Sequence, residues 1–506
     1  MRILLIDIAS TTLEEIWPSV EHSLGLMYLS SALKHRFGDR FRLKIWTLIS
    51  RPNRFHTEAD AALRVLEDWQ PDVVGIRSLT IGRDSLLGLI QTVNRWNENC
   101  FLVIGGPHAT DQPEEVLRGG SVDCVVIGEG EQTFCDLMER HLHRDPIWDI
   151  PGIAFLREGV FMQTAPRDLM VDLDTIPFPD YSLIDLDVFN NRYQTFSGKI
   201  SQRHGNILTT RGCPYRCMYC HNILGKKYRA RSPENVLAEI RYLHDEQGIT
   251  EIQVVDDIFN LDLDRAKKIC DLIIESDLEL ILSFPNGVRG DRMDKELIDK
   301  LAAAGTRFMS YAIESGSPRI QRLINKNLDL DKVEKAIEHT ARAGIITRGF
   351  FMLGFPTETE DEALQTVGFA NRSALCGATF FTVVYFPGTE LYRLAESLGY
   401  LQDGQYKANR DYVQTGEGAY EYSLETLNGI KLKAIREFAF TRNRIEGALR
   451  ILPRYYTQRE IDGFLMAFIV SSQLEYEDLT DPEVRRLLKR HFVIADRFSK
   501  KADYYV

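Results

Sequence analysis

The chain has 506 residues, of which 44% are hydrophobic and 26% charged, as in an ordinary globular protein. Its length predicts three domains, or one large domain with appendages. The formal charge of −12 argues against non-specific nucleic-acid binding, which needs a basic surface. No apolar run approaches the roughly 20 residues that span a bilayer. The start, MRILLIDIAS, is too short an apolar run for a signal peptide. We therefore expect a cytoplasmic protein with reduced thiols and no membrane span.

Residues 1–150 alternate short apolar runs with helical stretches. The runs at 3–6, 43–48, 73–76, 101–104 and 124–127 predict strands, and residues 26–33 and 85–96 predict helices. Continuously apolar strands that alternate with helices are typical of a parallel sheet covered on both faces. We therefore expect an α/β, doubly wound, Rossmann-like domain over 1–150, which would bind a ligand beyond the carboxyl ends of its strands.

Residues 151–203 interrupt this alternation. The segments 152–155 and 160–163 predict a hairpin, and the proline-containing stretch LDTIPFPDY that follows predicts a linker between domains.

A second alternation covers residues 204–392. Predicted strands lie at 207–210, 252–255, 281–284, 308–313, 349–353 and 379–385, with helices between them that begin at Ser232-Pro233, Asp294 and Asp331. Six such units predict a partial (β/α)6 barrel, related to the TIM barrel and open on one side. Residues 393–506 contain predicted helices at 424–450 and 456–475, and we expect this helical region to close the substrate side of the barrel.

Three of the eight cysteines lie within RGCPYRCMYC, with the spacing C-x3-C-x2-C. Cys213, Cys217 and Cys220 directly follow a predicted strand, where barrel active sites are built. Thiolates suit iron–sulfur clusters or zinc. A structural zinc site needs four ligands, and no fourth cysteine lies nearer than Cys270. His221 is more plausible as a packing group than as a fourth ligand. The alternative is three buried free cysteines, which is the rarer arrangement for thiols on one turn.

This motif resembles that of the radical S-adenosylmethionine (SAM) enzymes. The resemblance implies a 4Fe–4S cluster on the three cysteines, whose open iron holds the amino and carboxylate groups of SAM. One electron from the cluster would then cleave SAM to methionine and a 5′-deoxyadenosyl radical. The SAM-binding residues that the resemblance implies are Tyr219, Asp256, Asp257, Glu314, Ser315, Gly354 and Pro387. Taken singly, an aspartate here could merely cap a helix, and the glycine could belong to an ordinary turn.

The first domain resembles the cobalamin-binding domain that precedes the barrel in one large subfamily. The matching segments are HSLGLMYLSSAL, VVGIRSLT, VIGGPHAT and VIGEGEQTF. The implied cobalamin-binding residues are Ser78, Thr80, Gly105, Gly106, Pro107, His108, Gly128, Glu129 and Gly130. The motif D-x-H-x-x-G is absent, so the resemblance implies cobalamin without a histidine ligand from that motif. Arg77 stands where a small residue is common, which could alter the pocket or reflect a domain kept only for packing.

The function that these resemblances imply is a cobalamin-dependent radical SAM enzyme. The leading hypothesis is a C-methyltransferase acting at an unactivated carbon of a small molecule or natural product, supplied by a one-electron donor such as a flavodoxin. One alternative is a cyclase, oxidase or rearrangement enzyme that transfers no methyl group. Another is a non-enzymatic cobalamin- or redox-sensing module. Methylthio transfer to tRNA is disfavoured, because Cys100, Cys124 and Cys135 are scattered and the chain is acidic.

Overall fold

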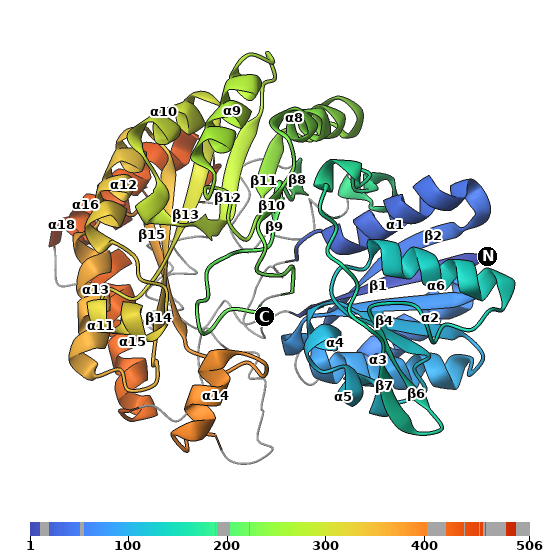
Figure 1. The fold of residues 1–506 in the computed structure, drawn as a ribbon. Coiled ribbons are helices and arrows are strands. Elements are labelled where there is room, and N and C mark those ends of the chain that lie inside the picture. Colours follow the sequence, from blue (N-terminus) through green and yellow to red (C-terminus); the bar gives the residue numbers. More distant parts are fainter. Residues whose placement is uncertain are drawn as a thin grey trace.

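The computed structural model describes residues 1–10, 20–50, 55–187, 189, 203–221, 223–401, 421–439, 441–454, 456–458, 461 and 482–491. Two α/β units lie side by side, one formed by the first third of the chain and the other by the part after residue 203 (Figure 1). No described helix combines the length and the apolar run that a bilayer crossing requires.

The first unit is a seven-stranded sheet in the order β2-β1-β3-β4-β5-β6-β7. Five strands are parallel: β1 (Arg2–Ser10), β2 (Arg42–Ser50), β3 (Val73–Ser78), β4 (Phe101–Gly105) and β5 (Cys124–Val126). Alternate residues of β1 enter two different cores. Leu4 and Ile6 pack with α2 (Phe55–Trp69) and α3 (Arg83–Trp96). Ile3 and Leu5 pack with α1 (Leu24–Phe37) and α6 (Glu131–His143). The predicted parallel sheet covered on both faces is confirmed.

The predicted hairpin forms as β6 (Ile153–Arg157) and β7 (Val160–Gln163), which pair antiparallel. Its place differs from the expected link between domains, because β6 also pairs antiparallel with β5. The hairpin therefore extends the first sheet, and the chain leaves that sheet after Gln163 rather than near residue 150.

The second unit is a sheet of six parallel strands in the order β15-β14-β13-β12-β11-β8. Its strands are β8 (His204–Ile207), β11 (Glu251–Val254), β12 (Ile281–Val288), β13 (Thr306–Glu314), β14 (Ile346–Leu353) and β15 (Gly377–Thr382). The helices α8 (Pro233–Arg241), α9 (Leu263–Ile274), α10 (Lys295–Ala303), α12 (Leu330–Arg342) and α13 (Glu360–Arg372) cover one face of the sheet (Figure 1). This arrangement confirms a partial (β/α)6 barrel, open between β8 and β15.

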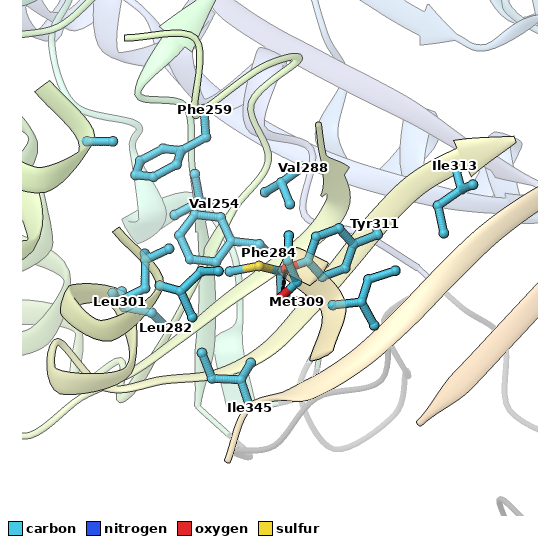
Figure 2. Close-up of a cluster of buried hydrophobic side chains, with 14 of the residues drawn as sticks. Val254, Phe259, Leu282, Phe284, Val288, Leu301, Met309, Tyr311, Ile313 and Ile345 are labelled. Atoms are coloured by element: carbon cyan, nitrogen blue, oxygen red, sulfur yellow. Dashed lines mark hydrogen bonds between the residues drawn. The ribbon is translucent and has the colours of Figure 1, made fainter. Parts of the chain in front are cut away.

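A continuous core fills the space between these strands and their helices. Phe284, Met309 and Tyr311 belong to it, as does Leu301 of α10 (Figure 2). Each is at most 2% exposed, so burial of large apolar side chains stabilises the barrel by roughly 1.5–3 kcal/mol for each of them. The hydroxyl groups of Tyr311 and Thr340 share a hydrogen bond of 2.6 Å, which satisfies the phenol inside the core.

The first barrel strand ends earlier than predicted. β8 spans His204–Ile207, whereas we predicted a strand over residues 207–210. The carboxylate of Asp256 accepts hydrogen bonds from the backbone N–H groups of Thr209 and Thr210 and from the Thr209 hydroxyl. These N–H groups are therefore satisfied by a side chain instead of a neighbouring strand, and the chain turns away from the sheet.

The described C-terminal helices extend the outer layer of the barrel. In α15 (Leu424–Ala439), Leu427, Ala434 and Phe438 join the barrel core. In α16 (Arg442–Ile451), the Arg444 guanidinium donates to backbone carbonyls that follow α13, including that of Ser373 at 3.2 Å. The predicted helix 456–475 lies almost entirely outside the described residues, as do residues 402–420.

Candidate active site

The three motif cysteines lie on one loop that rises from a short two-stranded stem. The stem is β9 (Thr210–Arg211) paired antiparallel with β10 (Arg229–Ala230), so that Arg211 lies opposite Arg229. β9 follows β8 after two residues, which places the loop at the carboxyl end of the first barrel strand. The expected position of the cysteines is confirmed.

Backbone hydrogen bonds hold this loop against the barrel. The N–H of Met218 donates to the carbonyl of Ile324 (2.9 Å), and the carbonyl of Met218 accepts from the N–H of Leu391 (2.9 Å). On the other side of the loop, the Arg289 guanidinium lies 3.9 Å from the ring centroid of Tyr215. The loop is therefore fixed to segments that follow β13, β15 and β12, and its cysteines keep a defined position relative to the barrel.

The chemistry of the donor set fits an iron–sulfur cluster. Cys213 and Cys217 are half-buried and Cys220 is exposed, so the thiols are open to an approaching cluster. Burial raises the pKa of the Cys213 thiol, and iron must therefore displace a proton to bind there. Among the residues that the structure describes, no three His, Cys, Asp or Glu side chains already converge as metal ligands do. The cysteines share one loop, and their thiolates are the ligands that such clusters use.

Gly212, directly before Cys213, has a geometry that only glycine accepts. Its φ is +81°, and a Cβ there would lie 2.4 Å from the carbonyl oxygen of Lys227 and 2.9 Å from that of Gly225. We expect Gly212→Ala to lower the iron content of the reconstituted protein to less than half, because the clash is with backbone that cannot rotate away. Gly159→Ala is the matched control, since Gly159 has φ +78° but open space around it. Equal iron content in the two variants would contradict this.

Tyr219 and Glu314 are brought together by a lysine that sequence reasoning missed. The Lys326 ammonium donates to the Tyr219 hydroxyl (3.1 Å) and to a carboxylate oxygen of Glu314 (2.9 Å). Lys326 and Glu314 are 6% and 7% exposed. Glu314 has φ +68°, which is uncommon for a residue other than glycine and points to a site under local constraint. The carboxylate expected to receive SAM is thus already oriented by Lys326.

Four other residues that the resemblance implies for SAM binding differ from one another in burial and in their contacts. The Asp256 carboxylate accepts hydrogen bonds from Thr209 and Thr210, so its structural role is to shape the turn after β8. Asp257 is exposed and close enough to Cys213 for its charge to raise the pKa of that thiol, after the larger effect of burial. Ser315 is buried, and its hydroxyl lies 3.1 Å from that of Thr366. Pro387 is half-buried in the turn after β15.

Gly354 forms a tight turn with a buried glutamate at the end of β14. Its φ is +89°, and its N–H donates to an Oε of Glu358 at 2.6 Å. The same oxygen accepts from the Tyr422 hydroxyl at 3.1 Å. Glu358 is fully buried, and this burial raises its pKa from 4.5 to about 7 despite those hydrogen bonds.

This pKa makes stability depend on pH in a defined direction. Between pH 4.5 and about 7 the folded state keeps the Glu358 proton that the unfolded chain releases, so the free energy of unfolding falls as pH rises. We expect a fall of about 3 kcal/mol, because one pKa unit corresponds to about 1.4 kcal/mol. Glu358→Gln should remove this pH dependence, because glutamine does not titrate, while its amide oxygen can still accept the hydrogen bond from the N–H of Gly354. Urea unfolding below and above this interval measures the difference, and parallel pH profiles for the two proteins would contradict the assignment.

The carboxyl edge of the first sheet forms a pocket of about 200 Å³. Five of the residues that were expected to bind cobalamin line this pocket: Gly105, Gly106, Gly128, Glu129 and Gly130. Gly128 has φ +77°, and a Cβ there would have nothing within 4 Å, whereas a Cβ on Gly106 would lie 2.8 Å from Cγ of Arg77. Bare backbone over an apolar floor fits a large flat ligand such as a corrin.

Four of the expected cobalamin residues do not line this pocket: Ser78, Thr80, Pro107 and His108. The Ser78 hydroxyl donates to the carbonyl of Leu79 at 2.8 Å. His108 lies in α4 (Pro107–Asp111) and is 1% exposed, with neither ring nitrogen in a hydrogen bond. Burial lowers the pKa of His108, so it is a neutral core residue that lies outside the pocket.

The pocket also has walls beyond the residues that were expected to bind cobalamin. Gly25, Leu26 and Leu29 of α1 line one side, and Leu208, Arg211, Ile223 and Leu224 reach it from the second unit. Arg77 lines it as well, and its guanidinium donates to Asp7 at 2.6 Å. The unusual arginine is therefore neutralised by a carboxylate on the neighbouring strand. The pocket lies between the first sheet and the cysteine loop, so both units contribute to one site.

Comparison with known proteins agrees with this geometry. A family model described as the radical SAM superfamily matches residues 207–370, and one described as the B12-binding domain matches residues 17–138. An uncharacterised methyltransferase of Pyrococcus horikoshii is 31% identical over 78% of this chain and 83% of its own length. The chain therefore belongs to the radical SAM enzymes that carry a B12-binding domain. Its cofactors are a 4Fe–4S cluster, SAM and cobalamin.

Two further relatives and one solved structure are also similar to this chain. Cytidylyl-2-hydroxyethylphosphonate methyltransferase of Streptomyces wedmorensis is 27% identical over 82% of this chain and 85% of its own length. An anaerobic magnesium-protoporphyrin IX monomethyl ester cyclase of Cereibacter sphaeroides is 26% identical, but over only 49% of its own length. The cobalamin-dependent SAM radical enzyme OxsB, solved with aqua-cobalamin and SAM, has the same fold, with a TM-score of 0.68 at 17% identity over 97% of this chain and 74% of that one.

Proposed function

We propose that this enzyme is a C-methyltransferase that acts at an unactivated carbon of a small molecule. The observation that carries the proposal is the shared pocket, where the glycine loops of the first sheet face Arg211, Ile223 and Leu224 of the cysteine loop. In such a site the cluster and SAM supply radical chemistry at carbon and cobalamin supplies a methyl group. This chain matches more than four fifths of the length of each of two proteins named methyltransferases. This similarity favours methyl transfer over cyclisation.

The inner face of the barrel sheet supports a small-molecule substrate. Ser310 and Arg348 are paired in register on β13 and β14, and their side chains lie opposite to the helix-covered face that buries Met309 and Tyr311. The Arg348 guanidinium donates to the Ser310 hydroxyl at 3.1 Å and lies 4.6 Å from the ring centroid of Phe350. Polar and aromatic groups inside a barrel are typical of a ligand site. We propose that a one-electron donor such as a flavodoxin drives the reaction and that nucleic acid is not a partner.

The test needs no knowledge of the substrate. Enzyme that is anaerobically reconstituted with its cluster and loaded with hydroxocobalamin, then reduced with titanium(III) citrate and given SAM without a substrate, should form S-adenosylhomocysteine as the SAM methyl group passes to the reduced cobalamin. Formation of 5′-deoxyadenosine without any S-adenosylhomocysteine would overturn the methyltransferase proposal and favour a cyclase or a rearrangement enzyme. Liquid chromatography separates S-adenosylhomocysteine from 5′-deoxyadenosine, and the absorption spectrum follows the state of the corrinoid.

A further inference from the structure

Buried charges join the stem of the cysteine loop to the first unit. In the β9–β10 ladder, Arg211 lies directly opposite Arg229, and each is 4% exposed. Two like charges opposite each other on neighbouring strands destabilise a ladder. A stem of two residues on each strand offers little else to offset that repulsion, so the loop depends on partners from outside.

Those partners are two glutamates of the GEGE segment, which follows β5 in the first unit. Arg229 makes two hydrogen bonds to Glu129, of 2.6 and 2.9 Å. Arg211 makes one of 2.6 Å to Glu131 and lies 3.5 Å from Glu129. The set contains two positive and two negative charges and is therefore neutral. We name these four residues, Glu129, Glu131, Arg211 and Arg229, the stem clasp.

The middle of the cysteine loop, just after its last cysteine, has its own contact with the first unit. His221, directly after Cys220, lies with Nδ1 2.6 Å from an Oδ of Asp111 at the end of α4. α4 follows the Gly105-Gly106 loop, as the clasp glutamates follow Gly128. The stem of the cysteine loop and the residue after its last cysteine therefore each contact a segment that follows one of the two glycine loops lining the pocket. Figure 1 shows β9 and β10 on the side of the second unit that faces the first.

We propose that the stem clasp couples the cobalamin pocket to the cysteine loop, so that the two cofactors bind cooperatively. Glu129 is the link, because it both lines the pocket and accepts both hydrogen bonds from Arg229. Ordering the GEGE segment around a corrin fixes the clasp glutamates, and these in turn fix the stem from which Cys213 departs. By reciprocity, a formed cluster orders the pocket for cobalamin to the same degree. The clasp residues are positioning residues, and the coupling holds whether or not a methyl group is transferred.

The experiment compares the affinity for hydroxocobalamin of the full-length protein before and after anaerobic cluster reconstitution, measured by quenching of tryptophan fluorescence. We expect the reconstituted wild type to bind roughly tenfold more tightly than the cluster-free protein, within the usual range of coupling between two sites. In Arg229→Gln the two affinities should become equal. A purely structural role for the clasp would weaken both affinities by the same factor and preserve their ratio, so this readout separates the two.

The controls keep the proposal falsifiable. Arg36→Gln in α1 removes the ion pairs with Asp136 and Glu139 of α6, where the Arg36 side chain is 39% exposed, and should leave the ratio unchanged. The double variant Glu129→Gln/Arg229→Gln should have the same affinity ratio as either single variant, because each substitution removes the same Glu129–Arg229 interaction. If Arg229→Gln does not fold, Asp111→Asn tests the contact of the loop at His221 and should reduce the ratio. A wild-type ratio of one, or an unchanged ratio in the variants that fold, would overturn the proposal.

Discussion

Replacing Cys217 by alanine is expected to abolish formation of 5′-deoxyadenosine from SAM. A cluster held by three thiolates loses one of its three protein ligands in this variant, and the two that remain cannot hold it in place. The reconstituted variant should contain little iron, lack the cluster absorption of the wild type, and form no 5′-deoxyadenosine when reduced. Folding should be retained, because Cys217 is half-buried and belongs to none of the apolar cores of the described residues.

Cys376→Ser provides the matched control for this variant. Cys376 is also a half-buried free cysteine, and its sulfur lies 3.7 Å from the Thr347 hydroxyl, far along the chain from the motif. This variant should keep its cluster and its SAM cleavage. Comparable loss of iron in both variants would mean that Cys217 acts through general stability, and wild-type iron content in Cys217→Ala would remove the cysteine motif from the site.

The sequence predicted the first sheet well because its central strands are apolar on both faces. Ile3, Leu4, Leu5 and Ile6 are each at most 1% exposed, although they point alternately to opposite sides. A run of this kind has few stable solutions other than a buried parallel strand. The error at β8 has a different origin. Its end depends on Asp256, which is distant in sequence and captures the N–H groups of Thr209 and Thr210.

The cysteines were predictable because the entire ligand set lies within eight residues. The clasp was not, because its residues follow two strands in different sheets and meet only in the folded protein. Glu129 was expected to bind cobalamin, and the structure shows its carboxylate already engaged by Arg229. Glu314 was likewise expected at the SAM site, whereas its partner Lys326 comes from the segment after α11 (Pro318–Leu323). Sequence reveals which groups are charged, but packing decides which charges pair.

The pocket of the first unit can be blocked without touching the cysteine loop. Gly105 ends β4 and lines the pocket, and a Cβ there would contact only Val126, at 3.8 Å. Since its φ is not in the left-handed region, leucine can adopt the backbone conformation. We expect Gly105→Leu to weaken binding of hydroxocobalamin by about 10- to 100-fold, because over-filling a packed site costs about 1–3 kcal/mol.

The same variant should retain its cluster and its capacity to form 5′-deoxyadenosine, while S-adenosylhomocysteine formation is lost. The matched control is Gly88→Leu in α3, where a Cβ meets nothing within 4 Å and no pocket residue is affected. Cobalamin affinity in Gly105→Leu that equals that of Gly88→Leu would place the corrin elsewhere. Loss of S-adenosylhomocysteine with SAM cleavage intact would instead show that the glycine loops of the first sheet serve methyl transfer and the cysteine loop serves radical formation, as two halves of one site.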